Sequence, residues 1–206
     1  FKILSGRGKE SSLSNPLFVR DKKKKFVDEL AIWIRGNFFI PDARSLWIRP
    51  SVKYLAEYIK QNNVDTIFSD GPPHTNTVIA CKLSQQFGIP WLADFQDPWT
   101  QVDYYKMMSI GRWADARHRK LEQACFKTAK KITIASPGWK TDLEAIGASN
   151  VDVLYYGYDE DDFTGINAER KEGFTILHSG VLGEDRLPVS LLKALSQLKQ
   201  EIPELA

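Results

Sequence analysis

The sequence has few of the residues that usually hold a metal-binding or disulfide-rich domain together. Its 206 residues include two cysteines, Cys81 and Cys125, and three histidines. The two cysteines match no metal-binding spacing, and two thiols are too few for a disulfide framework. Two isolated thiols are typical of a protein in a reducing cytosol.

Long apolar runs are also missing. No stretch of the sequence approaches the roughly 18 residues that a membrane-spanning helix needs, and no secretory signal opens the chain. Because the first residue is Phe1 rather than Met, we expect the chain to begin inside a longer protein. Hydrophobic residues make up 43% of the sequence, which is enough for a core and argues against global disorder.

Net charge is small but unevenly distributed. The formal net charge is +2, whereas residues 20–60 alone hold ten Lys or Arg and five Asp or Glu. The same segment contains the aromatic residues Trp33, Phe38, Phe39, Trp47, Tyr54 and Tyr58. This mixture suits an anionic membrane surface or nucleic acid. Our preferred interpretation is a solvated helix face with its aromatics in the core. Of the two alternative interpretations, we retain peripheral membrane contact through residues 20–60, and we expect no nucleic acid partner.

Strand and helix patterns alternate through the middle of the chain. Helical periodicity begins at residue 26 and resumes near Leu46, with Asp42 as a candidate cap for the second helix. Short apolar runs predict strands over residues 64–69, 89–95, 131–135 and 151–155, separated by helical patterns over 75–87, 112–130 and 137–146. This alternation predicts an α/β fold: a Rossmann-like parallel sheet with right-handed crossovers and flanking helices on its faces.

The end of the chain has a different pattern. Residues 156–173 are acidic and show no clear period, which predicts a linker. A strand over 174–178 and a helix over 188–199 follow, and two elements cannot bury a core of their own. We therefore expect a partial N-terminal domain over residues 1–155, the linker, and the start of a C-terminal domain over 174–206.

The residues with chemical potential follow the predicted strands, where ligands bind open parallel sheets. In chain order the motifs are S-D-G-P-P-H-T (69–75), I-P-W-L-A-D-F-Q-D-P-W-T (89–100), S-P-G-W-K (136–140), Y-G-Y-D-x-x-D-F (156–163) and F-T-I-L-H-S-G-V-L-x-x-x-R (174–186). This ordered set resembles glycosyltransferase family 4, and more narrowly its bacterial members that act in surface-polysaccharide assembly. The resemblance extends from about Ile32 to Ala206.

The resemblance implies half of a GT-B architecture, two facing Rossmann-like domains, truncated here at both ends. It implies transfer of a sugar from a nucleotide-diphosphate sugar to a glycan or lipid-linked acceptor, with retention of configuration and without a metal or other cofactor. It implies a cytoplasmic protein, with a peripheral place at the inner membrane as an alternative. The family's paired glutamates, eight residues apart in the C-terminal domain, are absent here, so we expect the isolated chain to be inactive.

His74 and Asp97 are the candidate catalytic residues. His74 precedes a predicted helix, where the helix N-terminus and the imidazole could meet a sugar hydroxyl or a phosphate; alternatively it is a loop histidine that caps the helix. Asp97 could hold charge near a developing oxocarbenium ion, or cap the chain ahead of Pro98. Because strand-end loops carry few packing contacts, we expect substitutions there to cost little stability.

The remaining candidates lie at the same strand ends. For substrate binding they are Gly71, Pro73, Asp94, Trp99, Ser136, Gly157 and Asp159. Asp94 could instead form a turn, and Trp99 could stack on a sugar or fill the core. Gly157 is expected to provide a tight turn. The Asp-x-Asp pattern that begins at Asp159 is interpreted as a solvated turn rather than a metal site.

Two further candidates concern the donor. A backbone without a Cβ at Gly180 would let a diphosphate approach, and Arg186 could neutralise it. His118 and His178 are interpreted as structural. The sequence departs from the family at Gln96, where relatives often have Arg, and at Tyr156, where many have Asn. The competing hypothesis is a non-catalytic Rossmann-like module that binds a glycan or an anion.

Overall fold

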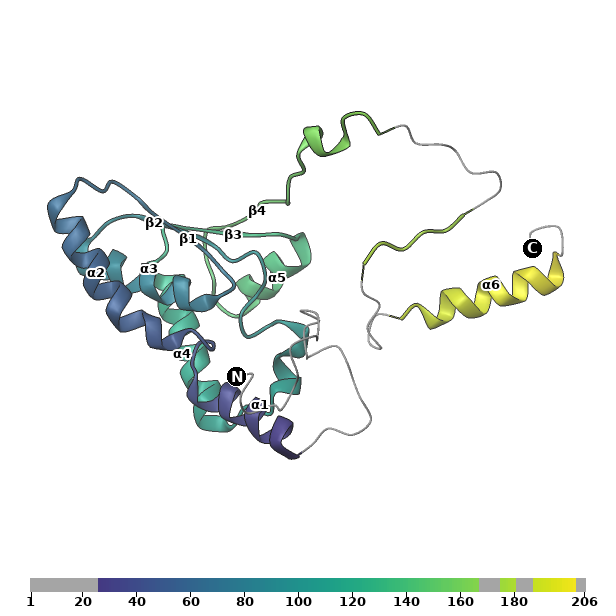
Figure 1. Cartoon of the computed structure of the whole chain (residues 1–206), viewed down its shortest axis with the longest axis horizontal. Coiled ribbons are helices and arrows are strands. Elements are labelled where there is room, and N and C mark those ends of the chain that lie inside the picture. Colours follow the sequence, from purple (N-terminus) through teal and green to yellow (C-terminus); the bar gives the residue numbers. More distant parts are fainter. Residues whose placement is uncertain (1–25, 167–174, 181–186, 203–206) are drawn as a thin grey trace. The chain divides into compact units, whose positions relative to one another are not determined.

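The computed structural model describes residues 26–166, 175–180 and 187–202 (Figure 1). These residues fall into two compact units. The first contains residues 26–159, and the second contains the described residues from Glu160 onward.

The first unit is built on a parallel sheet, as the sequence predicts. Its strands are β1 (Ile67–Asp70), β2 (Trp91–Asp94), β3 (Lys131–Ile134) and β4 (Val151–Val153), in the spatial order β1-β2-β3-β4. All three neighbouring pairs run parallel. The described part of the chain is therefore an α/β fold of the Rossmann-like kind.

Helices connect each strand to the next. The helices of this unit are α1 (Phe26–Phe38), α2 (Ile48–Gln61), α3 (His74–Phe87), α4 (Arg112–Thr128) and α5 (Pro137–Ala145), with short 3-10 turns η1 (Ser45–Trp47) and η2 (Asp103–Met108). Because each right-handed crossover steps in the same direction along the sheet, α3, α4 and α5 lie on one face of it, as Figure 1 shows. We expected helices on the faces of the sheet, without assigning each helix to a face. In this unit the connecting helices α3, α4 and α5 cover one face.

The core lies between that face of the sheet and the helices. Its fully buried side chains include Trp91 of β2 and Phe95 just after β2, Ile132 and Ile134 of β3, and Leu143 of α5. A smaller cluster joins α2 to α3 through Ala56, Ile79 and Leu83. These two clusters fix α2 and α3 relative to the strand ends.

The sequence correctly predicted the end of α3 and the start of α5 from local residues. Gly88 ends α3 with a φ of 68°, and its N–H donates to the Ser84 carbonyl at 2.8 Å. Ser136 caps α5 by accepting a hydrogen bond from the Trp139 N–H at 3.3 Å. The start of β1 was predicted three residues too early, because strand pairing begins only at Ile67, opposite Trp91.

The second unit contains a 3-10 turn, η3 (Glu160–Phe163), within the predicted linker, and one helix, α6 (Val189–Glu201). The predicted helix over 188–199 is confirmed. The predicted strand over 174–178 is wrong for its described part, because residues 175–178 have no neighbouring strand among the described residues to complete their backbone hydrogen bonds. None of the described helices is both long and apolar enough to span a bilayer.

Candidate functional site

The register of the sheet brings polar side chains into one row at its carboxyl end. Asp70 is paired with Asp94, and Asp94 with Thr133. Successive strand residues point to opposite faces, and the helix side is filled by buried residues such as Ala93 and Ile132. The row therefore lies on the face away from α3, α4 and α5.

Hydrogen bonds hold this row in place. The Thr133 hydroxyl donates to the Asp94 carboxylate at 2.7 Å, and the Gln96 amide donates to the Asp70 carboxylate at 2.6 Å. Gln96 has a φ of 36°, a left-handed conformation that costs a non-glycine residue about 1–2 kcal/mol. The bond to Asp70 offsets part of that cost and fixes the turn that leads to Asp97.

Tyr156 connects the row to the end of the first unit. Burial raises the pKa of Tyr156, and the negative charges of Asp97, Asp94 and Asp70, in that order, raise it further. These three carboxylates thus lie within electrostatic reach of one phenol, whose side chain is 67% exposed. Asp97 also contributes, after burial, to the raised pKa of Tyr104. We call Asp70, Asp94, Gln96, Asp97 and Tyr156 the acidic edge.

His74 lies in a different environment from the acidic edge. It begins α3, is only 8% exposed and stacks on Trp99 with ring centroids 4.8 Å apart. Burial lowers the pKa of His74 to about 4, although the Asp42 carboxylate opposes this shift. The imidazole is therefore neutral near pH 7. Its Nδ1 atom is buried, with no hydrogen-bond partner among the described residues.

The N-terminus of α3 is already capped. Asp42 accepts hydrogen bonds from the Thr75 N–H at 2.8 Å and from the Thr75 hydroxyl at 2.9 Å. A carboxylate at this position satisfies a helix N–H and complements the helix dipole. Asp42 also accepts a hydrogen bond from the Arg44 N–H at 2.9 Å, just ahead of η1, so it caps the turn that leads into α2, although the N-cap of α2 itself is Trp47. The expectation that a phosphate meets the N-terminus of α3 is wrong, because Asp42 occupies it.

Gly71 and Pro73 shape the entry to α3. The Gly71 N–H donates to the Asp94 carbonyl at 3.0 Å, which extends the pairing of the first two strands. A Cβ at Gly71 would lie 2.8 Å from the Thr77 hydroxyl and 3.3 Å from His74 Nδ1. Pro73 is half-buried at the N-cap, and its carbonyl accepts from Asn76 at 3.0 Å. In the structure, Gly71 and Pro73 allow the chain to pass close to α3.

Trp99 is a core residue. It is 3% exposed, one ring face is stacked on His74, and its Nε1–H donates to His118 Nδ1 at 3.0 Å. The expectation that Trp99 stacks on a sugar is wrong, because its ring is buried. His118 is itself buried, so its structural interpretation is confirmed. Next in sequence, Thr100 donates both its N–H and its hydroxyl to the buried Glu122 carboxylate, at 3.1 and 2.6 Å.

The other predicted substrate-binding residues are Ser136, Gly157 and Asp159. Ser136 uses its hydroxyl as the cap of α5. The expected tight turn at Gly157 is wrong, because residues 154–159 form no turn or bend; Gly157 has no positive φ, and a Cβ there would meet nothing within 4 Å. Asp159 is exposed and ends the first unit. In the part of the chain that the structure describes, no group of three or more His, Cys, Asp or Glu could hold a metal ion.

Of the two predicted donor residues, the structure describes Gly180, which belongs to the second unit. Gly180 is exposed and has a φ of 141°, a backbone conformation that favours glycine. Arg186 lies outside the described residues. The role of this pair in binding a diphosphate therefore stays a prediction.

Three contacts of this region join residues that sequence reasoning did not connect: Asp42 with Thr75, Gln96 with Asp70, and Thr133 with Asp94. Each joins residues 26 to 39 positions apart, so only the fold brings them together. Comparisons of the chain with family models, curated proteins and solved structures found no match.

Proposed function

We propose that the chain is part of a nucleotide-sugar-dependent glycosyltransferase and that the acidic edge binds the reacting sugar. The observation that carries the proposal is the row of Asp70, Asp94 and Thr133 at the carboxyl end of a parallel sheet, held by the Gln96–Asp70 and Thr133–Asp94 hydrogen bonds. Tyr156 lies within electrostatic reach of Asp70, Asp94 and Asp97. Open α/β sheets bind ligands at this end. Carboxylates and a phenol are suitable partners for sugar hydroxyls, since together they offer acceptors and a donor.

Each group of the edge has a distinct part in this chemistry. As a nucleotide diphosphate leaves, positive charge develops at the anomeric carbon, and a nearby carboxylate stabilises it. We assign that role to Asp97. Asp94 keeps acceptor capacity beyond its bond with Thr133 and is assigned to a sugar hydroxyl. A tyrosine phenol is protonated at neutral pH and can donate a hydrogen bond, and the raised pKa of Tyr156 favours that form further.

We assign His74 a part in holding the acidic edge in place and no part in the reaction itself. Its ring is packed against Trp99, two residues after Asp97 in the sequence. A buried neutral imidazole at this place fixes the loop that carries Asp97. We therefore assign His74 as a positioning residue, in place of the catalytic role that the sequence predicts.

Titration of the 206-residue chain with uridine- and guanosine-diphosphate sugars, and with mono- and oligosaccharides, tests the proposal. We expect weak saccharide binding that Asp97→Asn and Tyr156→Phe reduce. Asp142→Asn, an exposed carboxylate on α5, is the matched control and should bind normally. Saccharide binding unaffected by the first two variants would contradict the site. Binding without sugar transfer in the whole protein would favour a non-catalytic glycan-binding module.

A further inference from the structure

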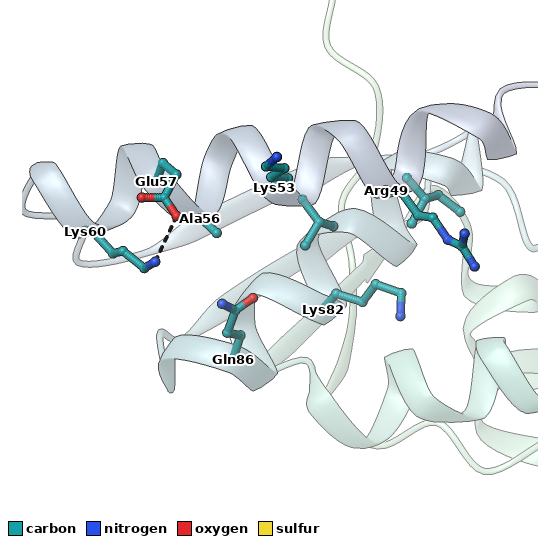
Figure 2. Close-up of a pocket in the computed structure, with 9 residues that line it drawn as sticks. Arg49, Lys53, Ala56, Glu57, Lys60, Lys82 and Gln86 are labelled. Atoms are coloured by element: carbon teal, nitrogen blue, oxygen red, sulfur yellow. Dashed lines mark hydrogen bonds and ion pairs between the residues drawn. The ribbon is translucent and has the colours of Figure 1, made fainter.

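Helix α3 presents different side chains to its two neighbours, α2 and α4. Figure 2 shows Lys82 and Gln86 extending from α3 at the open groove that it forms with α2. Leu83 packs in the small cluster on the same side. Cys81 belongs instead to the main core cluster, which it shares with Cys125 of α4. The two cysteines thus lie on the interior side of α3.

The side of the first unit formed by α1 and α2 is open to solvent in comparison. Five aromatic side chains of these helices and of the turn before α2 are exposed: Trp33, Phe38, Trp47, Tyr54 and Tyr58. The preferred prediction that the aromatics of residues 20–60 fill the core is therefore wrong for these five. The interior of the unit lies between the sheet and the helices that connect its strands, where the cysteines meet.

The packing of α3 against α4 places the two cysteines at the same level. Both helices connect successive strands of the parallel sheet, so they run in the same direction. The Gln85 side-chain amide donates to the Thr128 hydroxyl at 2.8 Å and fixes the register of the two helices. About one helical turn before these residues lie Cys81 on α3 and Cys125 on α4. The two cysteines, far apart in the sequence, therefore face each other in the fold.

The thiols of Cys81 and Cys125 contact each other directly. They are hydrogen-bonded to one another, and their residues are only 4% and 1% exposed. The interpretation of the two cysteines as isolated thiols is therefore wrong.

The surroundings distinguish the two thiols. The hydrogen bond with Cys125 lowers the pKa of the Cys81 thiol against the opposing effect of burial, and Thr128 and Lys82 lower it further. The same hydrogen bond, together with burial, raises the pKa of the Cys125 thiol. Because the thiolate is the nucleophile, Cys81 is the thiol that reacts first and Cys125 the thiol that follows.

We propose that Cys81 and Cys125 are a site of reversible oxidation, at which hydrogen peroxide converts the two thiols into a disulfide between α3 and α4. The Cys81 thiolate attacks one peroxide oxygen, the O–O bond breaks, and a sulfenic acid forms as hydroxide leaves. That hydroxide takes the proton of Cys125, whose sulfur attacks the Cys81 sulfur and breaks its S–O bond. The second hydroxide takes up the proton that Cys81 first released. The two thiols lose two electrons in total, and the peroxide is reduced to two water molecules.

The position of the pair defines both the oxidant and the consequence. Burial restricts the oxidant to a molecule as small as hydrogen peroxide. The disulfide ties together the two helices that support the loop of Asp97, because His74 of α3 stacks on Trp99 and Glu122 of α4 holds Thr100. The oxidation uses no residue of the acidic edge and does not depend on the proposed sugar transfer.

Peptide mapping by mass spectrometry tests the oxidation on the 206-residue chain. After hydrogen peroxide treatment of the folded chain, we expect one peptide pair linked through Cys81 and Cys125, lighter by two hydrogen atoms than the separate peptides. Dithiothreitol should release the pair. In Cys125→Ser the reaction should stop at the Cys81 sulfenic acid, which dimedone traps, whereas in Cys81→Ser dimedone labelling should be lost. In denaturant, where the thiols lose their contact, the two variants should be labelled at equal rates.

Three results would overturn the proposal. They are the absence of the linked peptides after peroxide treatment, a disulfide that forms between two chains in place of the internal one, and equal labelling of the two folded variants. The linked peptides are measured on the unaltered chain, so the first two results do not depend on how either variant folds. Melting temperatures under reducing conditions establish that the variants compared for labelling are folded.

Discussion

The turn after β1 and the turn after β2 lie side by side at the carboxyl end of the sheet, yet they have different surroundings. In the first, His74 is buried against Trp99 and the following helix is capped by Asp42. In the second, Gln96 leads to the half-buried Asp97 beside the exposed phenol of Tyr156. Strand-end position alone therefore does not tell which side chains are accessible, because local packing decides that.

The largest expected effect concerns the second turn. On the proposed function, Asp97→Asn in the whole protein should lower kcat for sugar transfer a hundredfold or more, because an interaction made in the transition state is worth about 2.7–4 kcal/mol. The melting temperature should stay close to that of the unaltered protein, since Asp97 is not a core residue. Steady-state kinetics and thermal unfolding on the same samples check this. A kcat within a few-fold of the unaltered protein would remove Asp97 from the proposed mechanism.

The first turn should instead control acid stability. The folded chain keeps His74 neutral down to about pH 4, whereas in the unfolded chain its pKa is 6.5. Between these values the unfolded state binds more protons, so stability is full above pH 6.5 and falls as the pH drops toward 4. The loss is about 3 kcal/mol at most. Denaturant unfolding across this range should show a smaller pH slope in His74→Gln, and an unchanged slope would contradict the burial of His74.

The burial of His74 also corrects an expectation about stability. We expected substitutions in both strand-end turns to cost little folding energy. That expectation fails for His74, because its ring packs between Phe95 and Trp99, with ring centroids 5.6 and 4.8 Å away. It stays a prediction for Asp97.

Two glycine-to-alanine variants test how closely the chain packs at Gly71. Gly71→Ala should destabilise the chain by about 1–3 kcal/mol, because its Cβ would lie 2.8 Å from the Thr77 hydroxyl. Gly157→Ala, the matched control, should change stability by less than about 0.5 kcal/mol, because its Cβ would meet nothing within 4 Å. Equal free energies of unfolding for the two variants would contradict the close approach of β1 to α3.

The smallest effect concerns the cap of α3. Asp42→Ala removes both hydrogen bonds to Thr75 and should lower the free energy of unfolding by about 1 kcal/mol. Asp142→Ala removes an exposed carboxylate from α5 and should have almost no effect. If the two variants were equally stable, α3 would not depend on this cap.

The sequence predicted the sheet because its signals are local. Helix ends at Gly88 and Ser136 depend on residues within a few positions of each other. The cap of α3 by Asp42 could not be predicted, since the partners are 33 positions apart and meet only after the sheet has formed. The same holds for Gln96 and Asp70, 26 positions apart. Residue type alone also could not tell that Trp99 is buried while Trp47 is exposed.

The central claim is that saccharides bind at the acidic edge and not at the start of α3. Backbone amide chemical shifts of the 206-residue chain, followed during titration with an oligosaccharide, test it most directly. The account predicts that the largest shifts occur at Asp94, Asp97 and Tyr156, with little change at Thr75 and Asn76. Largest shifts at the start of α3, with an unchanged acidic edge, would contradict it.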